Sequence, residues 1–265
     1  VLSAETYDKD SFRHLSVSLR GENIDTLTKF CKHAEEMMFE LRDDCINAYV
    51  WKANNSYWDR RGIVFQRDMG SVVVDPKEKQ RLLSDITSFE AHETREWYKK
   101  HGIPYKRGYL FHGPPGTGKT SMIRALATLL KRSIHTMTLV QQGLTDMSLS
   151  QALQDVEGPA IVVFEDVDAL FNTQRDKLDH FALTFAGLLN AIDGVTTNLG
   201  LILIFTTNFP EKLDKALIRK GRIDHKMHFT RFGLDLCKQM FAGFYPSAPP
   251  TIVAQFASAA RGANP

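Results

Sequence analysis

An eight-residue run constrains the fold of this chain more than any other feature. It fits the pattern G-x-x-x-x-G-K-S/T and consists of Gly113, Pro114, Pro115, Gly116, Thr117, Gly118, Lys119 and Thr120. An apolar, strand-like run at residues 108–112 precedes it, and helical spacing of Met122, Ile123, Leu126 and Leu129 follows. Glycines in such a loop let backbone N–H groups surround phosphate oxygens at a helix N-terminus. The run predicts a phosphate-binding loop between a strand and a helix.

Two side chains of this run have specific expected roles. Lys119 can reach the β- and γ-phosphates of a nucleotide such as ATP, and the Thr120 hydroxyl can ligate Mg²⁺. The competing interpretation is a Gly-Pro turn that binds nothing. The strand before the run and the helix after it favour the nucleotide site.

Further apolar runs at residues 133–139, 160–164 and 201–205 alternate with helical segments. Short β-rich runs separated by helices are typical of a buried parallel sheet. The predicted fold class is therefore α/β, with helices flanking a parallel sheet.

An acidic cluster directly follows the run at residues 160–164. It comprises Glu165, Asp166 and Asp168. Carboxylates at the carboxyl end of a parallel strand lie where α/β sheets bind ligands, so one can hold Mg²⁺ and the next can orient an attacking water. A helix cap or turn is the alternative, and the nearby phosphate loop favours the catalytic interpretation.

Three downstream residues are further candidates. Asn208 follows the run at 201–205 and can fix a water beside the γ-phosphate, or simply form a turn before Pro210. Arg219 and Arg222 lie three apart around a glycine. They form either a solvated basic loop or a pair presented to a neighbouring subunit's nucleotide, where an arginine neutralises charge in the transition state.

The pattern changes near Asp75, which can cap a helix whose first residue is Pro76. Before it, strand-like runs at 12–20, 45–51 and 63–66 and a helical run at 24–41 predict a small α+β domain over residues 1–75. Residues 76–230 form the expected large α/β domain. Helices at 234–244 and 252–260 predict a partial helical lid over residues 231–265.

Composition limits the classes of partner. The 33 Lys and Arg residues nearly balance the 31 Asp and Glu residues, which disfavours nucleic acid as a partner recruited by charge. Cys31, Cys45 and Cys237 lack metal-binding spacing. No apolar run approaches the roughly 20 residues that span a bilayer.

Taken together, residues 75–230 resemble the AAA ATPase family. The phosphate loop, the acidic strand end, residues 205–208 and residues 217–224 carry the resemblance. Residues 97–109 and 183–194 resemble one branch, the mitochondrial inner-membrane chaperones that translocate the folded Rieske iron-sulfur protein during assembly of respiratory complex III.

This resemblance implies a homo-oligomeric, heptameric ring with ATP and Mg²⁺ as cofactors. It also implies a transmembrane helix upstream of residue 1, a family-specific middle domain near residues 10–75, and an ATPase domain that faces the matrix. Asn208 is then similar to the sensor residue, and Arg219 and Arg222 to the trans-acting arginine fingers. The order Glu165-Asp166 reverses the common Asp-Glu order, so the division of metal and water roles between them stays open.

Residues 138–149, where threading relatives carry an aromatic-glycine pore loop, contain no Phe, Tyr or Trp. This disfavours gripping an unfolded chain and suits a folded cargo. Two other functions are possible for such a chain. One is a nucleic-acid motor or clamp-loader-like ATPase, which is disfavoured because this sequence has no basic patch with interleaved aromatic residues. The other is a P-loop small-molecule kinase.

Overall fold

The computed structural model describes residues 2–9, 12–19, 25, 28–30, 32, 45–171, 183–194 and 200–260. The chain divides into two compact units, Val1–Cys45 and Ile46–Pro265. In the first unit, β1 (Leu2–Lys9) and β2 (Phe12–Leu19) form an antiparallel hairpin. The strand expected from residue 12 is confirmed, and the helix expected over residues 24–41 lies largely outside the described residues.

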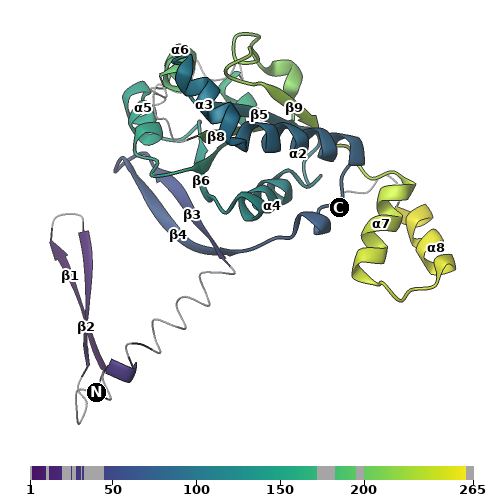
Figure 1. Cartoon of the computed structure of the whole chain (residues 1–265), viewed down its shortest axis with the longest axis horizontal. Coiled ribbons are helices and arrows are strands. Elements are labelled where there is room, and N and C mark those ends of the chain that lie inside the picture. The colour runs from purple at the N-terminus through teal and green to yellow at the C-terminus, as the bar shows by residue number, and fades with distance from the viewer. Residues whose placement is uncertain are drawn as a thin grey trace. The chain divides into compact units, whose positions relative to one another are not determined.

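A seven-stranded sheet forms the centre of the second unit, in the order β4-β3-β6-β7-β8-β5-β9 (Figure 1). Its strands are β3 (Cys45–Lys52), β4 (Tyr57–Phe65), β5 (Lys106–His112), β6 (Ser133–Thr138), β7 (Ala160–Glu165), β8 (Leu201–Thr207) and β9 (His225–His228). The pairs from β3 through β6, β7, β8 and β5 to β9 are all parallel. The predicted α/β class is therefore confirmed.

Helices and short 3-10 turns connect these strands. The helices are α2 (Pro76–Glu90), α3 (His92–Lys100), α4 (Lys119–Leu130), α5 (Asp146–Gln154), α6 (Phe185–Asp193), α7 (Leu234–Phe244) and α8 (Pro250–Ala260). The turns are η1 (Met69–Ser71), η2 (Val167–Phe171) and η4 (Pro210–Lys212).

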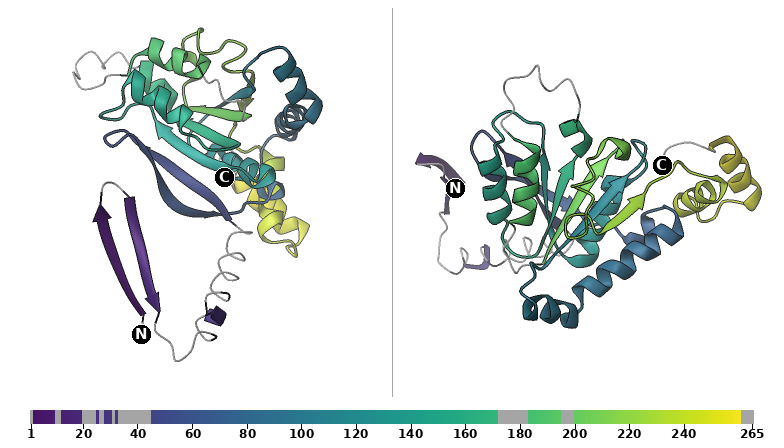
Figure 2. Two further views of the ribbon diagram at one scale, coloured as in Figure 1. Left: turned by 60° about the vertical axis from the view of Figure 1, so that its left-hand side comes forward. Right: turned by 90° about the horizontal axis from the view of Figure 1, so that it is seen from above.

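Two hydrophobic cores lie against the sheet because side chains alternate along each strand. Phe164 and its stacked neighbour Phe205 belong to the core that also contains Leu188 of α6. Val163, one residue earlier on β7, belongs to the core that contains Leu126 of α4. The sheet thus has helices on both faces (Figure 2), and its central strands β7 and β8 are buried between them.

Helix α2 begins as the sequence predicts. The Asp75 carboxylate accepts hydrogen bonds from the backbone N–H groups of Lys77 (2.8 Å) and Glu78 (3.2 Å), which satisfies two donors of the first turn. On α4, by contrast, the expected apolar stripe is wrong at Leu129, which is 53% exposed. It lies in the last turn of that helix, on the side away from the core.

The second unit begins well before residue 75, where the sequence places a domain boundary. Strand β3 pairs with β6 from Ala48 opposite Ile134 to Val50 opposite Thr136. Trp51 is buried in a core of the sheet. Because β3 and β4 extend this sheet, residues 46–75 are part of the same compact unit as the phosphate loop.

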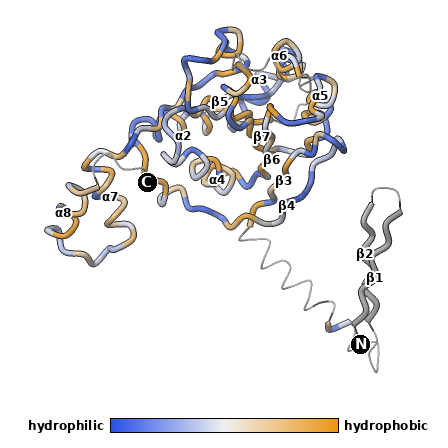
Figure 3. The backbone as a smooth tube through the Cα atoms, turned by 180° about the vertical axis from the view of Figure 1, so that it is seen from behind, coloured by the Kyte–Doolittle hydropathy of each residue, from blue (hydrophilic) through white to orange (hydrophobic). Residues whose placement is uncertain are grey.

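The C-terminal helices α7 and α8 form a hairpin with a small core of their own, containing Phe232, Cys237 and Ala257. Figure 3 shows hydrophobic stretches in this hairpin as well as in the central strands. Both predicted lid helices are confirmed in position. Within the described part of the chain, no helix has the length and apolar character needed to cross a membrane.

Candidate nucleotide-binding site

The phosphate loop connects the carboxyl end of β5 to the first turn of α4, the context that the motif requires. Gly113 has φ +141°, and a Cβ there would lie 2.0 Å from the Phe229 carbonyl oxygen. Gly118 has φ +97° immediately before α4. Both positions therefore need glycine. Within the loop, the buried Thr117 donates its hydroxyl hydrogen to the Pro114 carbonyl (2.7 Å).

Lys119 links this loop to the neighbouring strand. Its Nζ donates hydrogen bonds to the carbonyl oxygens of Gly113 (2.7 Å) and Pro114 (3.0 Å) and to Asn208 Oδ1 (2.8 Å). Burial lowers the pKa of Lys119, while Asp166 and Asp168 oppose that shift. The ammonium is thus held among oxygen acceptors, an arrangement that phosphate oxygens can join.

The acidic pair lies at the end of β7, as the sequence predicts. Glu165 is the last residue of that strand, and both Glu165 and Asp166 line the same cavity as Lys119 and Thr120. Burial raises the pKa of Glu165, and the neighbouring charge of Asp166 raises it further. Two repelling carboxylates in a partly desolvated position favour a cation between them.

This donor set fits Mg²⁺. The cation prefers oxygen ligands, usually one or two carboxylates together with substrate phosphates, and Thr120, Glu165 and Asp166 supply a hydroxyl and two carboxylates. The described residues hold no group of three or more His, Cys, Asp or Glu side chains suited to a metal.

Two consecutive threonines at the end of β8 connect to the acidic segment. Thr206 Oγ1 accepts a hydrogen bond from the backbone N–H of Asp166 (3.1 Å). Thr207 Oγ1 donates to Asp168 Oδ1 (2.5 Å) and accepts from the backbone N–H of Phe209 (2.9 Å). The sequence left Asn208 open between a sensor and a turn residue. In the structure Asn208 lies in a bend directly after β8, and its Oδ1 accepts a hydrogen bond from Lys119 Nζ (2.8 Å).

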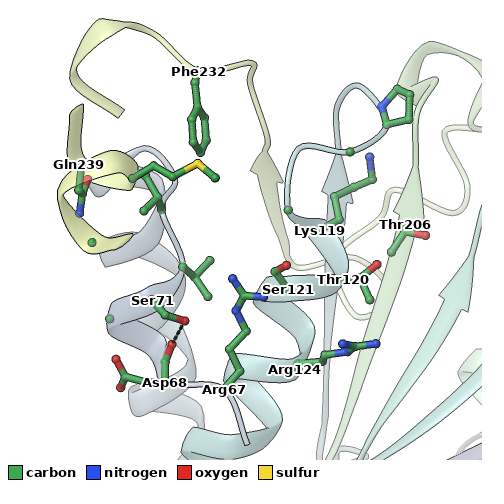
Figure 4. A pocket seen from close by; sticks show the side chains of 18 of the residues that line it. Arg67, Asp68, Ser71, Lys119, Thr120, Ser121, Arg124, Thr206, Phe232 and Gln239 are labelled. Carbon is green, nitrogen blue, oxygen red and sulfur yellow. Dashed lines mark hydrogen bonds between the residues drawn. The ribbon is translucent and has the colours of Figure 1, made fainter. Parts of the chain in front are cut away.

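A cavity of 1220 Å³ is lined by the phosphate-loop, acidic-pair and β8-end residues Lys119, Thr120, Glu165, Asp166, Thr206 and Asn208, and it extends well beyond them. Figure 4 shows Lys119, Thr120 and Thr206 on one side and the residues Asp68, Ser71, Phe232 and Gln239 across the cavity. The far wall comes from the segment after β4 and from α7. The sequence analysis did not predict this wall, because no motif marks it. The signal that could have indicated it is weak, namely apolar residues such as Phe65 that lie close to polar residues at the end of a strand.

Arg219 and Arg222 do not line this cavity. Arg222 makes a bidentate contact with Asp193 through Nε (3.0 Å) and Nη2 (2.5 Å) and donates to the Ala216 carbonyl (2.6 Å). Arg219 is exposed, and its side chain has no hydrogen bond or ion pair within the described ranges. The two arginines thus differ: one is tied to its own chain and the other is available to another molecule.

The fold and the cavity belong to a known class. The family model described as "ATPase family associated with various cellular activities (AAA)" matches residues 109–231, which include the phosphate loop, the acidic strand end and both arginines. Residues 109–231 therefore form an AAA ATPase domain, and the expected resemblance is confirmed for that part of the chain.

Within that family the chain is similar to proteins named as mitochondrial chaperones. It is 36% identical over 244 residues to "Probable mitochondrial chaperone BCS1-A" of Dictyostelium discoideum, covering 88% of this chain and 57% of that protein. It is 39% identical over 253 residues to "Mitochondrial chaperone BCS1" of Danio rerio, covering 92% and 59%. "Probable mitochondrial chaperone bcs1" of Schizosaccharomyces pombe is 42% identical over 187 residues, covering 69% and 41%. The chain spans about half the length of these relatives.

Proposed function

We propose that this chain is the ATP-hydrolysing module of an AAA chaperone that moves or remodels a protein cargo. The observation that carries the proposal is the meeting of Lys119, the acidic pair and Asn208 at one edge of the sheet, inside one cavity. Three separate strand ends supply these groups, from β5, β7 and β8. A turn that binds nothing has no need of such convergence.

The residues divide the work of hydrolysis by their chemistry. The loop from Gly113 to Thr120 surrounds the phosphates with backbone N–H groups, and Lys119 exchanges its carbonyl acceptors for β- and γ-phosphate oxygens. Thr120 and Glu165 would hold Mg²⁺, and a bound Mg²⁺ would neutralise charge on the phosphates. Asp166 accepts the proton of the attacking water, and Asn208 orients that water.

The arginines complete a neighbour's site. An arginine that serves its own nucleotide has to reach its own cavity, and neither Arg219 nor Arg222 does so. The exposed side chain of Arg219 makes it the first candidate for contact with the γ-phosphate of an adjacent subunit. Arg222 has to leave Asp193 before it can act in the same way. Such a contact neutralises charge that develops in the transition state.

The particular biological role rests on the relatives and on the resemblance of the sequence. Relatives named as mitochondrial chaperones support a mitochondrial location. We extend this to a heptameric ring at the inner membrane, anchored by a helix upstream of residue 1, with the ATPase domain in the matrix. The proposed cargo is the folded Rieske iron-sulfur protein. Residues 138–149 lack aromatic side chains, which suits a folded rather than a threaded cargo.

ATP turnover measured against protein concentration tests this function, together with particle images of the full-length protein with and without a non-hydrolysable ATP analogue. We expect turnover per subunit to rise as rings form and the images to show closed rings. Turnover that is stimulated by DNA instead supports a nucleic-acid motor. Phosphoryl transfer to a metabolite by a monomer supports a small-molecule kinase, and either result contradicts the chaperone assignment.

A further inference from the structure

Asp166 has an unusual backbone conformation for a residue with a side chain. Among the described residues, the non-glycine positions with positive φ are Ser56, Lys131 and Asp166. Ser56 lies in the connection between β3 and β4, and Lys131 ends α4, where left-handed residues are common. Asp166, at φ +48°, lies inside the cavity instead. Strained backbone of this kind persists only where its surroundings hold it.

Two hydrogen bonds hold the backbone of Asp166. Its N–H donates to Thr206 Oγ1 (3.1 Å), and its carbonyl oxygen accepts from the backbone N–H of Ala169 (2.9 Å). The second bond belongs to the turn η2, so it is local. The first crosses to β8, beyond the paired residues Phe164 and Phe205. Thr206 is only 7% exposed, so most of its side chain is packed against the protein.

The position of this hydroxyl is itself fixed. The next residue, Thr207, is fully buried and bonds to Asp168 Oδ1 (2.5 Å), which is also buried. The two threonines therefore tie the end of β8 to the acidic segment at consecutive positions. The Thr206 bond holds the peptide plane before Asp166 and the Ala169 bond holds the plane after it, so the two bonds together maintain its left-handed conformation.

We propose that Thr206 is a positioning residue for ATP hydrolysis, which holds the backbone of Asp166 so that its carboxylate points at the attacking water. The inference rests on the proposed function and deepens it. An aspartate side chain is one methylene shorter than a glutamate, so the reach of its carboxylate depends strongly on the backbone. The reversed Glu165-Asp166 order therefore gives this contact a purpose that a longer base would not need.

Matched substitutions of Thr206 in the full chain test the proposal. Thr206→Val keeps the shape of the side chain and removes the acceptor, whereas Thr206→Ser keeps the acceptor. We expect valine to lower kcat about tenfold, since small misplacements of catalytic groups have effects of this order or larger, and to leave ATP affinity within about twofold. Serine restores kcat. If valine disturbs packing, Thr206→Ala removes the same acceptor without the added methyl group.

A second arm separates positioning from a merely structural role. In an Asp166→Asn background the carboxylate that accepts the proton is already lost, so Thr206→Val should lower kcat no further. An equal loss in both backgrounds, a loss of ATP affinity, or wild-type kcat in the valine and alanine variants overturns the proposal. Failure of the proposed function gives a different result. In that case the wild-type chain either does not hydrolyse ATP or hydrolyses it at a rate that Lys119→Ala leaves unchanged.

Discussion

The two sides of the cavity are built differently. At the phosphate side, Thr117, Thr206 and Thr207 are buried and hydrogen-bonded, and Lys119 joins two strand ends. Across the cavity, Phe65 and Phe244 are 79% and 73% exposed although both line it. The polar groups of the first side are therefore held by hydrogen bonds before a ligand enters, whereas the two aromatic rings across the cavity are largely exposed to solvent.

This difference indicates what each side contributes. Preorganised polar groups stabilise charge that appears during reaction without the cost of reorganising. Exposed aromatic side chains gain by covering a ligand, as stacking on a base does. We therefore expect the phosphate side to control turnover, and the side formed by residues 65–73 and α7 to adjust affinity by small factors.

The largest effect is expected from Lys119→Ala. Charge-assisted hydrogen bonds contribute about 1.5–3 kcal/mol each, so losing the cation should weaken ATP binding by about 100-fold or more and abolish turnover. The exposed Lys100→Ala serves as the charge-matched control. Binding by calorimetry and unfolding by heat measure the two consequences, and the fold should survive. Unchanged ATP affinity in this variant would contradict the assignment of residues 113–120 as a phosphate-binding loop.

The acidic pair should show a separation of roles. Asp166→Asn is expected to slow hydrolysis by about 100-fold with ATP still bound, in the range typical of a lost general base. Glu165→Gln should instead weaken the dependence of ATP binding on Mg²⁺. Single-turnover hydrolysis and binding at varied Mg²⁺ measure both. The opposite pattern, in which Glu165→Gln traps bound ATP, exchanges the two roles.

The arginines do not line either side of the cavity. Their substitutions should have similar effects on turnover but different effects on stability, because the two side chains make different contacts. Arg219→Ala and Arg222→Ala are each expected to lower turnover about tenfold or more with ATP binding nearly intact. Only Arg222→Ala should also lower the free energy of unfolding, by about 1 kcal/mol, because it loses the contact with Asp193. Thermal unfolding beside steady-state turnover distinguishes them. Equal stability losses in both variants contradict the difference in contacts.

The smallest effect is expected across the cavity. Phe244→Ala should weaken ATP affinity about threefold and leave kcat within twofold, since an exposed aromatic ring contributes little until it covers a ligand. Tyr245→Ala is the matched control, because Tyr245 is also exposed on the adjoining position but does not line the cavity. A loss of kcat in the Phe244 variant shows that this side takes part in the chemistry.

The phosphate side could be predicted from the sequence because its signals are local. The glycine spacing, Lys119 and the apolar run before Glu165 are each contained in a short stretch of chain. Parallel strands then bring their carboxyl ends to one edge. The helix start at Asp75 and the lid helices could be predicted for the same reason, since helix capping and helical spacing depend on residues close together in the sequence.

The rest depends on pairing between distant segments. Nothing near Ala48 or Val50 indicates that β3 lies beside β6, so the sequence placed the domain boundary too late. The short β9 was not predicted, since only Met227 in it is buried. The link from Thr206 to Asp166 spans 40 positions, and the ion pair of Arg222 depends on Asp193 in α6, 29 positions away.

Mixing two inactive variants tests the central claim most directly, namely that one subunit completes the ATP site of the next. Differently tagged Asp166→Asn subunits with intact arginines are combined with Arg219→Ala subunits that retain Asp166, and copurification verifies mixed rings. The account predicts that turnover returns, because some sites then pair an intact Asp166 with a neighbour's Arg219. Mixed rings without turnover, together with wild-type subunits that hydrolyse ATP equally well when diluted to monomers, would contradict it.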